Sequence, residues 1–147
     1  MLILNSEKLK DYHANKRMWQ GIPGIEVTGQ GRLFVTFYSG GKTEEVGNYC
    51  VLVKSDDDGE TWSESIAAIY DTEKSRCFDP CLWIDPLNRL WFIFSQAPDF
   101  GVWCAVCQNP DGDVLEWSEP RRIAEGVMMN KPIVLKNGEW LFPCAVW

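Results

Sequence analysis

The chain has 147 residues, a formal net charge of −7 and an apolar fraction of 46%, with eight Trp, seven Phe and four Tyr. The negative charge argues against nucleic acid and anionic lipid as partners, because both need basic patches. Nothing in the sequence approaches the ~18 consecutive apolar residues of a membrane span, so no membrane partner is expected.

Residues 1–18 are expected to form a lead-in segment. The apolar start, Met1-Leu2-Ile3-Leu4, is too short for the core of a signal peptide. The protein as read is therefore expected to be cytoplasmic. A secreted or periplasmic location is the alternative if the N-terminus is incomplete.

Residues 19–147 contain a repeated unit, with boundaries at about 19–75, 76–126 and 127–147. Each unit opens with an apolar run that follows a proline. Pro23 and Pro80 are 57 positions apart, and Pro80 and Pro132 are 52 apart. Repetition at this period is typical of propellers and related arrays.

Each unit continues with a turn and a second apolar run, over residues 32–38, 89–94 and 139–142. The first two units add a third strand, at 49–54 and 102–107, and a short fourth strand, at 66–70 and 121–124. Four antiparallel strands per unit predict an all-β fold, a partial β-propeller of about two and a half four-stranded blades. A β-sandwich is the alternative.

Two and a half blades would leave an unpaired strand edge and an uncovered blade face. We therefore expect the chain to be the N-terminal portion of a longer propeller that supplies the missing blades. Self-association that completes a ring is the second possibility.

The connection between the third and fourth strands of the first unit carries the most specific motif, Ser-x-Asp-x-Gly-x-Thr-Trp. Its side chains suit a hairpin turn, because Ser and Asp accept backbone hydrogen bonds, Gly permits positive φ and Trp can fold beneath the turn. An ordinary acidic turn is the alternative. Residues 109–117 form a degenerate copy. The motif residues are Ser55, Asp57, Gly59, Thr61 and Trp62.

The six cysteines raise the question of a metal or disulfide site. Cys104 and Cys107 have CxxC spacing, but they lie on a predicted strand, where residues three apart point to opposite faces. The only histidine, His13, is remote in the sequence. Buried free thiols are therefore predicted, with no metal and no other cofactor.

Candidate site residues follow from propeller geometry. The innermost strand of each blade starts at the funnel mouth, and the loop between strands two and three borders the same face. Glycosidases need carboxyl groups beside the scissile bond, so Glu44, Glu45 and Asp79 are the predicted catalytic residues. Solvated loop carboxylates and a turn-capping Asp are the structural alternatives. The predicted substrate-binding residues are Gln20, Lys42, Asn48, Arg76, Asn130 and Lys131.

Over residues 17–147 the chain resembles the sialidase / BNR-repeat superfamily, whose Asp box has the pattern of residues 55–62. Trp19-Gln20-Gly21-Ile22-Pro23-Gly24 resembles its first blade, and residues 78–83 and 129–138 resemble its second and third. The resemblance implies Asp boxes remote from the funnel, a carboxylate acid/base in the loop of Glu44 and Glu45, and a carbohydrate ligand.

The implied function is a sialidase-like glycoside hydrolase or a related polysaccharide lyase, inactive without the later blades that supply its nucleophile. A non-catalytic propeller that binds glycan or protein is the alternative. Sialidases open the first blade with Arg-Ile-Pro, and that arginine binds the sialate carboxylate. This chain has Gly21 there. The departure implies a different or neutral sugar.

Overall fold

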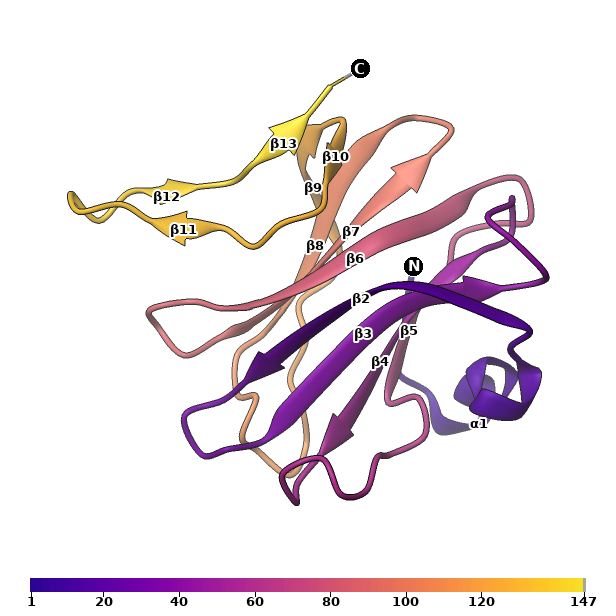
Figure 1. Cartoon of the computed structure of the whole chain (residues 1–147), viewed down its shortest axis with the longest axis horizontal. Helices are drawn as coiled ribbons and strands as arrows, with labels where there is room; N and C mark the ends of the chain where they lie inside the picture. Colours follow the sequence, from indigo (N-terminus) through magenta and orange to yellow (C-terminus); the bar gives the residue numbers. More distant parts are fainter. Residues whose placement is uncertain (147) are drawn as a thin grey trace.

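The computed structural model describes residues 1–146; Trp147, the last residue of the third predicted unit, lies outside them. The fold is all-β, with 46% strand and 7% helix, and its sheets are antiparallel and open (Figure 1). The all-β prediction is confirmed. The strands arise where β-branched and aromatic residues alternate between turn residues.

The first sheet contains five strands in the order β1-β5-β4-β3-β2. Four of them are the strands expected in the first unit. The fifth, β1, comes from the N-terminal segment and pairs with β5, so this segment is an integral part of the sheet. The strands are β1 (Leu2–Ile3), β2 (Trp19–Val27), β3 (Leu33–Gly40), β4 (Tyr49–Ser55) and β5 (Ala67–Ile69).

The second sheet has the order β6-β7-β8-β9, and two short antiparallel pairs follow it, β10 with β13 and β11 with β12. Figure 1 shows the two larger sheets side by side, with the C-terminal hairpin beyond the second. The strands are β6 (Arg76–Ile84), β7 (Leu90–Ala97), β8 (Gly101–Cys107), β9 (Arg121–Glu125), β10 (Val127–Met128), β11 (Ile133–Val134), β12 (Trp140–Leu141) and β13 (Cys144–Ala145).

Three short helices cover the face of the first sheet that points away from the second: α1 (Ser6–Leu9), η1 (Lys10–Tyr12) and η2 (Ala14–Lys16). The Asn5 side chain begins α1 by accepting hydrogen bonds from two backbone N–H groups, at 3.1 Å each. Buried Leu9 packs on Tyr49 and Val51, and Tyr12 meets Tyr49 edge-on at 4.7 Å. Within residues 1–146, no helix has the length and apolar character to cross a bilayer.

The main hydrophobic core lies between the two larger sheets. Phe34 and Tyr38 of β3 pack there against Phe78 and Leu82 of β6. Each such side chain contributes about 1.5–3 kcal/mol when fully buried. A second core joins the other face of the second sheet to the C-terminal hairpin, where Trp83 meets Trp140 at 5.0 Å.

The cysteines behave as predicted from strand geometry. Cys104 lies in the second core and Cys107 in the first, so they occupy opposite faces of β8. All six cysteines are free thiols, and all except Cys144 are buried. Burial raises the pKa of the Cys77 and Cys81 thiols to about 12, so both stay protonated near neutral pH.

The three units share the geometry of their first turn. The turn closes through Thr28 N to Arg32 O at 2.9 Å, Asp85 N to Arg89 O at 3.0 Å and Leu135 N to Glu139 O at 2.8 Å. The residue before each closing position has positive φ: 92° at Gly31, 59° at Asn88 and 86° at Gly138. The same turn geometry therefore recurs three times in the described backbone.

The two inner strands also share an irregularity. The pairing of β2 with β3 shifts register between Gly21 and Gly24, and that of β6 with β7 shifts between Phe78 and Cys81. A Cβ on Gly24 would lie 3.3 Å from the Cα of Cys81, so β2 and β6 touch just beyond their bulges. Bulges redirect side chains. The second one positions Asp79.

Candidate functional site

The turn at residues 55–62 is held by its own side chains. Ser55 Oγ donates to Asp57 Oδ1 at 2.7 Å and accepts from Gly59 N at 2.9 Å. Asp57 also accepts from the hydroxyl and the backbone N–H of Thr61, at 2.5 and 2.9 Å. These bonds, led by the one from the Thr61 hydroxyl, lower the pKa of Asp57 to about 2.

Trp62 folds back onto the same turn. Its Nε1 donates to Gly59 O at 3.1 Å, yet 43% of the residue stays exposed. Trp62 therefore braces the turn without entering the core. Each polar group of the motif has a partner inside the turn, which indicates a structural role.

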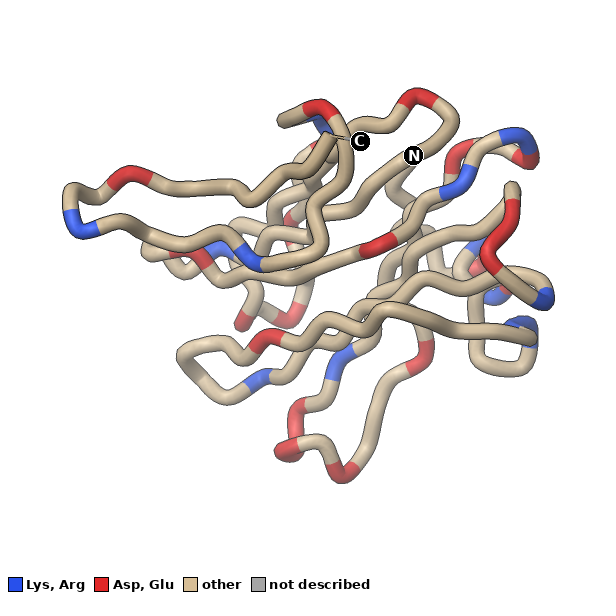
Figure 2. The backbone as a smooth tube through the Cα atoms, turned by 45° about the horizontal axis from the view of Figure 1, so that its top comes forward, with Lys and Arg blue, Asp and Glu red and all other residues tan. Residues whose placement is uncertain are grey.

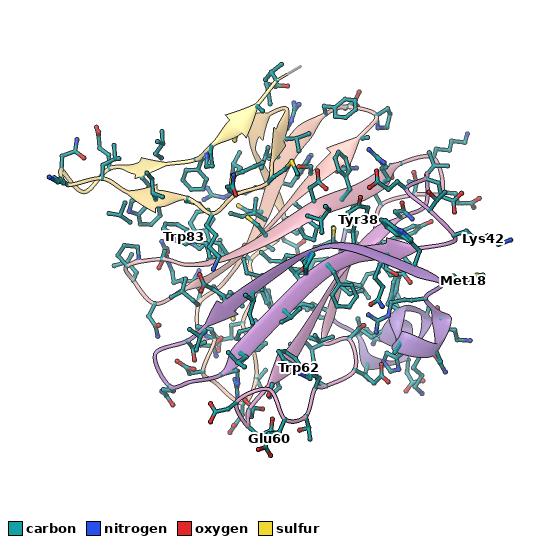
Figure 3. All side chains as sticks on the ribbon, in the orientation of Figure 1. Met18, Tyr38, Lys42, Glu60, Trp62 and Trp83 are labelled. Atoms are coloured by element: carbon teal, nitrogen blue, oxygen red, sulfur yellow. The ribbon has the colours of Figure 1, made fainter. Side chains whose placement is uncertain are left out.

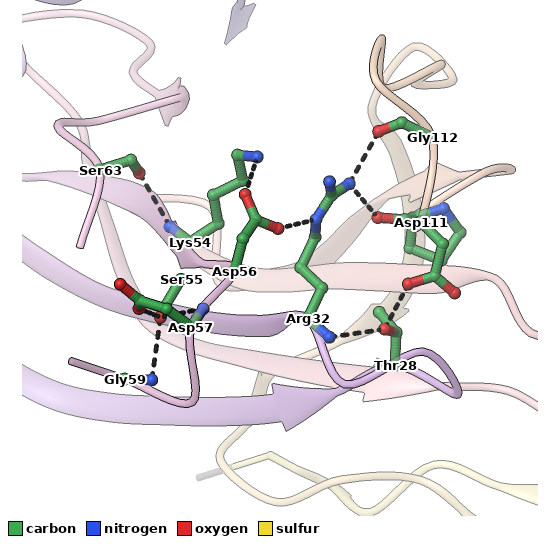
Figure 4. Close-up of polar contacts among 11 residues, drawn as sticks. Thr28, Arg32, Lys54, Ser55, Asp56, Asp57, Gly59, Ser63, Asp111 and Gly112 are labelled. Atoms are coloured by element: carbon green, nitrogen blue, oxygen red, sulfur yellow. Dashed lines mark hydrogen bonds and ion pairs between the residues drawn. The ribbon is translucent and has the colours of Figure 1, made fainter. Parts of the chain in front are cut away.

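Arg32 ties this end of the first unit to the second (Figure 4). Its guanidinium donates to Asp56 Oδ1 at 2.5 Å and to the carbonyl oxygens of Pro110 and Gly112 at 2.9 and 2.7 Å. Thr28 adds a hydrogen bond to Asp111. The 55–62 turn and the 109–117 segment are thereby joined as one framework.

The loop of residues 41–48 lies at the opposite end of β4 from the 55–62 turn, and there a cluster of titratable side chains forms. The Tyr38 hydroxyl donates to Glu44 Oε1 at 2.5 Å, and Arg76 Nη1 lies 3.5 Å from Glu44 Oε2. The guanidinium carbon of Arg76 also sits 4.3 Å from the ring centre of Phe78. The cluster therefore draws Glu44 from the loop, Tyr38 from β3 and Arg76 from β6.

Asp79 belongs to the same cluster through its electrostatics. Burial raises the pKa of the Asp79 carboxyl, the negative charge of Glu44 raises it further, and Arg76 partly offsets both. Burial also raises the pKa of Tyr38, with the hydrogen bond to Glu44 as the second cause, so Tyr38 stays a hydrogen-bond donor. Glu44 is a carboxylate beside two donors, and Asp79 is a carboxyl group with a raised pKa. Two carboxyl groups in such different environments can divide the roles of base and acid.

The other residues predicted for the loop shape it. Glu45 Oε1 accepts from Lys42 N at 3.2 Å, and Asn48 Oδ1 accepts from Glu45 N at 2.7 Å. Buried Asn48 also packs beneath Gly40, where a Cβ would come within 2.2 Å of its Nδ2. The Lys42 side chain extends outward from the fold (Figure 3).

The remaining predicted residues have contacts outside the loop of residues 41–48. Gln20 accepts from Arg17 Nη1 at 3.4 Å, and Asn130 O lies 3.8 Å from Cys81 Sγ, two residues beyond Asp79. Lys131 Nζ donates to Ile25 O at 2.7 Å and to Glu26 Oε1 at 2.8 Å. The structure thus brings Glu44 and Arg76 together, with Asp79 close enough to respond to their charges. The other predicted residues have other partners: Gln20, Lys42, Glu45, Asn48, Asn130 and Lys131.

Tyr38 is the member of the cluster that sequence reasoning missed. It is 1% exposed, and strand alternation places it on the same face of β3 as Phe34. That pattern marks Tyr38 as a core residue. Its hydroxyl contacts Glu44, which lies in the loop that follows the end of β3 at Gly40.

A sizeable hollow lies elsewhere in the fold. It has a volume of about 540 Å³ between β9 and the C-terminal hairpin, with Trp91, Arg121, Trp140 and Phe142 in its lining. The same aromatic residues build the second core, so the hollow continues an inter-sheet packing surface. Its lining contains no carboxyl group, so it offers no carboxylic acid or carboxylate base for catalysis.

A metal centre finds no support in the described part of the chain, where no group of three or more His, Cys, Asp or Glu side chains is placed to hold an ion. The chain matches no protein-family model, and a search among curated proteins finds no match. Membership of the sialidase / BNR-repeat superfamily therefore stays a prediction.

Proposed function

We propose that this chain is part of a sialidase-like β-propeller that acts on glycan chains as a glycoside hydrolase. The proposal rests chiefly on the cluster of Tyr38, Glu44, Arg76 and Asp79. This cluster lies at the end of β4 opposite the 55–62 turn, as the Asp-box resemblance requires. The shared turns and the shared bulges of the inner strands support the reading of the two larger sheets as successive blades.

In the proposed mechanism Asp79 supplies the proton. Its raised pKa increases the protonated fraction of the carboxyl at a given pH, and this protonated form donates to the glycosidic oxygen as the bond between sugar carbon and leaving oxygen breaks. Glu44, held by Tyr38 and Arg76, raises the proton affinity of Asp79 and accepts hydrogen bonds from sugar hydroxyls. The nucleophile would come from a further blade, so the chain alone binds glycan without turnover.

Further blades are the proposed partners. Apolar side chains of the C-terminal hairpin remain uncovered: Ile133 is 54% exposed and Leu141 is 51% exposed. A blade packed on this hairpin would bury them, as the second sheet buries Phe34 of the first. A longer chain is the proposed source of such blades, and other copies of this chain are the second.

Glycan binding by the isolated chain tests the proposal. We expect glycan-array binding that Glu44→Gln and Asp79→Asn each weaken at least tenfold. Glu60→Gln, an equally conservative change in the 55–62 turn at the far end of β4, should leave binding within twofold of the parent. In a complete ring that contains these residues, Asp79→Asn should lower kcat about 100-fold or more.

A propeller that binds glycan or protein without catalysis is the second candidate. The buried aromatic side chains packed beside the cluster favour it. Tyr38 and Phe78 are both almost fully buried there, with ring centres 6.5 Å apart. Glycan binding without any turnover in the complete ring would overturn the catalytic proposal and leave this one. Unchanged turnover in the Asp79→Asn ring would instead overturn the role assigned to Asp79.

A further inference from the structure

We propose that Trp19 is the specificity-determining residue of the site, a stacking platform that selects a neutral pyranose over an anionic sugar. This inference rests on the proposed glycan-binding function. It concerns a residue at the start of β2, beside the carboxyl cluster.

The first observation is the position of the Trp19 ring. A Cβ built on Gly21 would lie 2.9 Å from both Cη2 and Cζ2 of Trp19, closer than real Cβ contacts come. The indole therefore occupies the space that a side chain at position 21 would need. Glycine at this position lets the ring lie against the backbone of β2.

The second observation is that this ring borders the carboxyl cluster. Trp19 meets Tyr38 edge-on, with ring centres 4.8 Å apart, and the Tyr38 hydroxyl binds Glu44. Trp19 is only partly buried, so part of its surface faces solvent next to those polar groups. An aromatic surface with a few hydrogen-bonding groups beside it suits a sugar, whose C–H face is apolar and whose edge carries hydroxyls.

The third observation is the charge around the ring. Glu44 and Asp79 are acidic, and the nearby Arg76 is already engaged with Glu44 and Phe78. Arg17 lies 4.9 Å from the Phe37 ring, on the sheet face that the N-terminal helices cover. Lys131 is bound to Glu26. Figure 2 shows basic segments interspersed with acidic ones along the loops, several of them at the right-hand end of the fold. A sugar carboxylate would therefore meet two carboxyl groups, and the guanidinium of Arg76 beside them is already engaged.

The test measures binding of four soluble probes to the chain by tryptophan fluorescence and by ligand-observed NMR. The neutral probes are methyl β-galactoside and N-acetylgalactosamine, and the anionic ones are glucuronate and N-acetylneuraminate. We expect the neutral sugars to bind at least tenfold more tightly. Trp19→Ala should weaken their binding at least tenfold, whereas Trp62→Ala, which removes the exposed indole at the far end of β4, should change it less than twofold.

Two further variants keep the test decisive. Trp19→Phe retains an aromatic ring and should keep most of the binding even if Trp19→Ala folds poorly. The double variant Trp19→Ala/Gly21→Arg frees the space and fills it with a guanidinium, so it should shift the preference toward glucuronate.

The outcomes separate the inference from the proposed function. Tight binding of an anionic sugar by the parent, or neutral-sugar binding that survives Trp19→Ala, would overturn the role of Trp19 and leave a glycan site in place. Failure of all four probes to bind the folded parent would overturn the inference together with the glycan-binding function.

Discussion

Asp79 occupies in the second sheet the position that Ile22 occupies in the first. Each is the residue before a proline inside the bulge of an inner strand, and each has positive φ, 44° at Asp79 and 46° at Ile22. This conformation is costly for a β-branched residue and easier for Asp. The repeated bulge thus presents an aliphatic residue in one unit and a carboxyl group in the next.

The strain at Ile22 predicts an unusual response to glycine. Ile22→Gly should leave stability unchanged or raise it by about 1 kcal/mol, because relief of the positive φ outweighs the entropy that glycine loses on folding. The matched control is Ile25→Gly on the same strand, where an exposed side chain has regular pairing with Val35. That control should cost about 1 kcal/mol. Urea unfolding measures both, and an equal loss in the two variants would contradict the prediction.

Asp79→Asn should raise the melting temperature at neutral pH. The folded-state pKa of Asp79 lies above its usual value of 3.8, so its favourable contribution is complete only below about pH 4 and is lost as the pH rises through the folded-state pKa. Asparagine removes the buried charge and tolerates positive φ. The gain should therefore be present at pH 7 and disappear below about pH 4. A variant less stable than the parent at pH 7 would contradict this sign.

Asp57→Asn should behave in the opposite way. The pKa of Asp57 is lowered to about 2, so its contribution is present above the usual value of 3.8 and is lost as the pH falls toward 2. The variant should melt below the parent at pH 7, and the gap should narrow from about pH 4 downward. Circular dichroism melts from pH 7 to pH 2.5 measure the gap. A constant gap would show that the charged hydrogen bonds to Thr61 contribute nothing.

Arg32→Ala should destabilise the fold by about 2 kcal/mol, because it breaks three hydrogen bonds and leaves two carbonyl oxygens of the neighbouring turn without their donor. Arg32→Lys should not restore the loss, since an ammonium group cannot reproduce the guanidinium fork. The control is Lys10→Ala, because Lys10 pairs with exposed Glu7 and such pairs contribute little. Urea unfolding of the three variants should show only the Arg32 changes as large.

Leu9→Ala should cost about 2–3 kcal/mol, since Leu9 is 5% exposed and packs on the outer face of the first sheet. Leu4→Ala, at a residue that is 45% exposed, serves as control and should cost less than about 1 kcal/mol. Equal losses would mean that the N-terminal helices do not stabilise the sheet.

The sequence by itself determined much of the local structure: the strands of the two larger sheets apart from β1, the turns that recur between strands and the self-contained turn at residues 55–62. Alternation and turn chemistry act over a few residues, so they can be read without knowledge of the fold. The opposite orientation of Cys104 and Cys107 also followed from the period of a strand alone.

Only the tertiary structure decided which predicted site residues meet. Glu44 and Arg76 are 32 positions apart, and their contact depends on how the loop after β3 reaches the start of β6. Tyr38 looks like an ordinary core residue in the sequence, and nothing local reveals that Trp19 covers Gly21. The two-residue strand β1 is likewise too short to predict, because its stability comes from pairing with Ile69, distant in the chain. Such contacts depend on how the side chains and segments pack in the folded chain, and the pattern of a short stretch of residues does not reveal that packing.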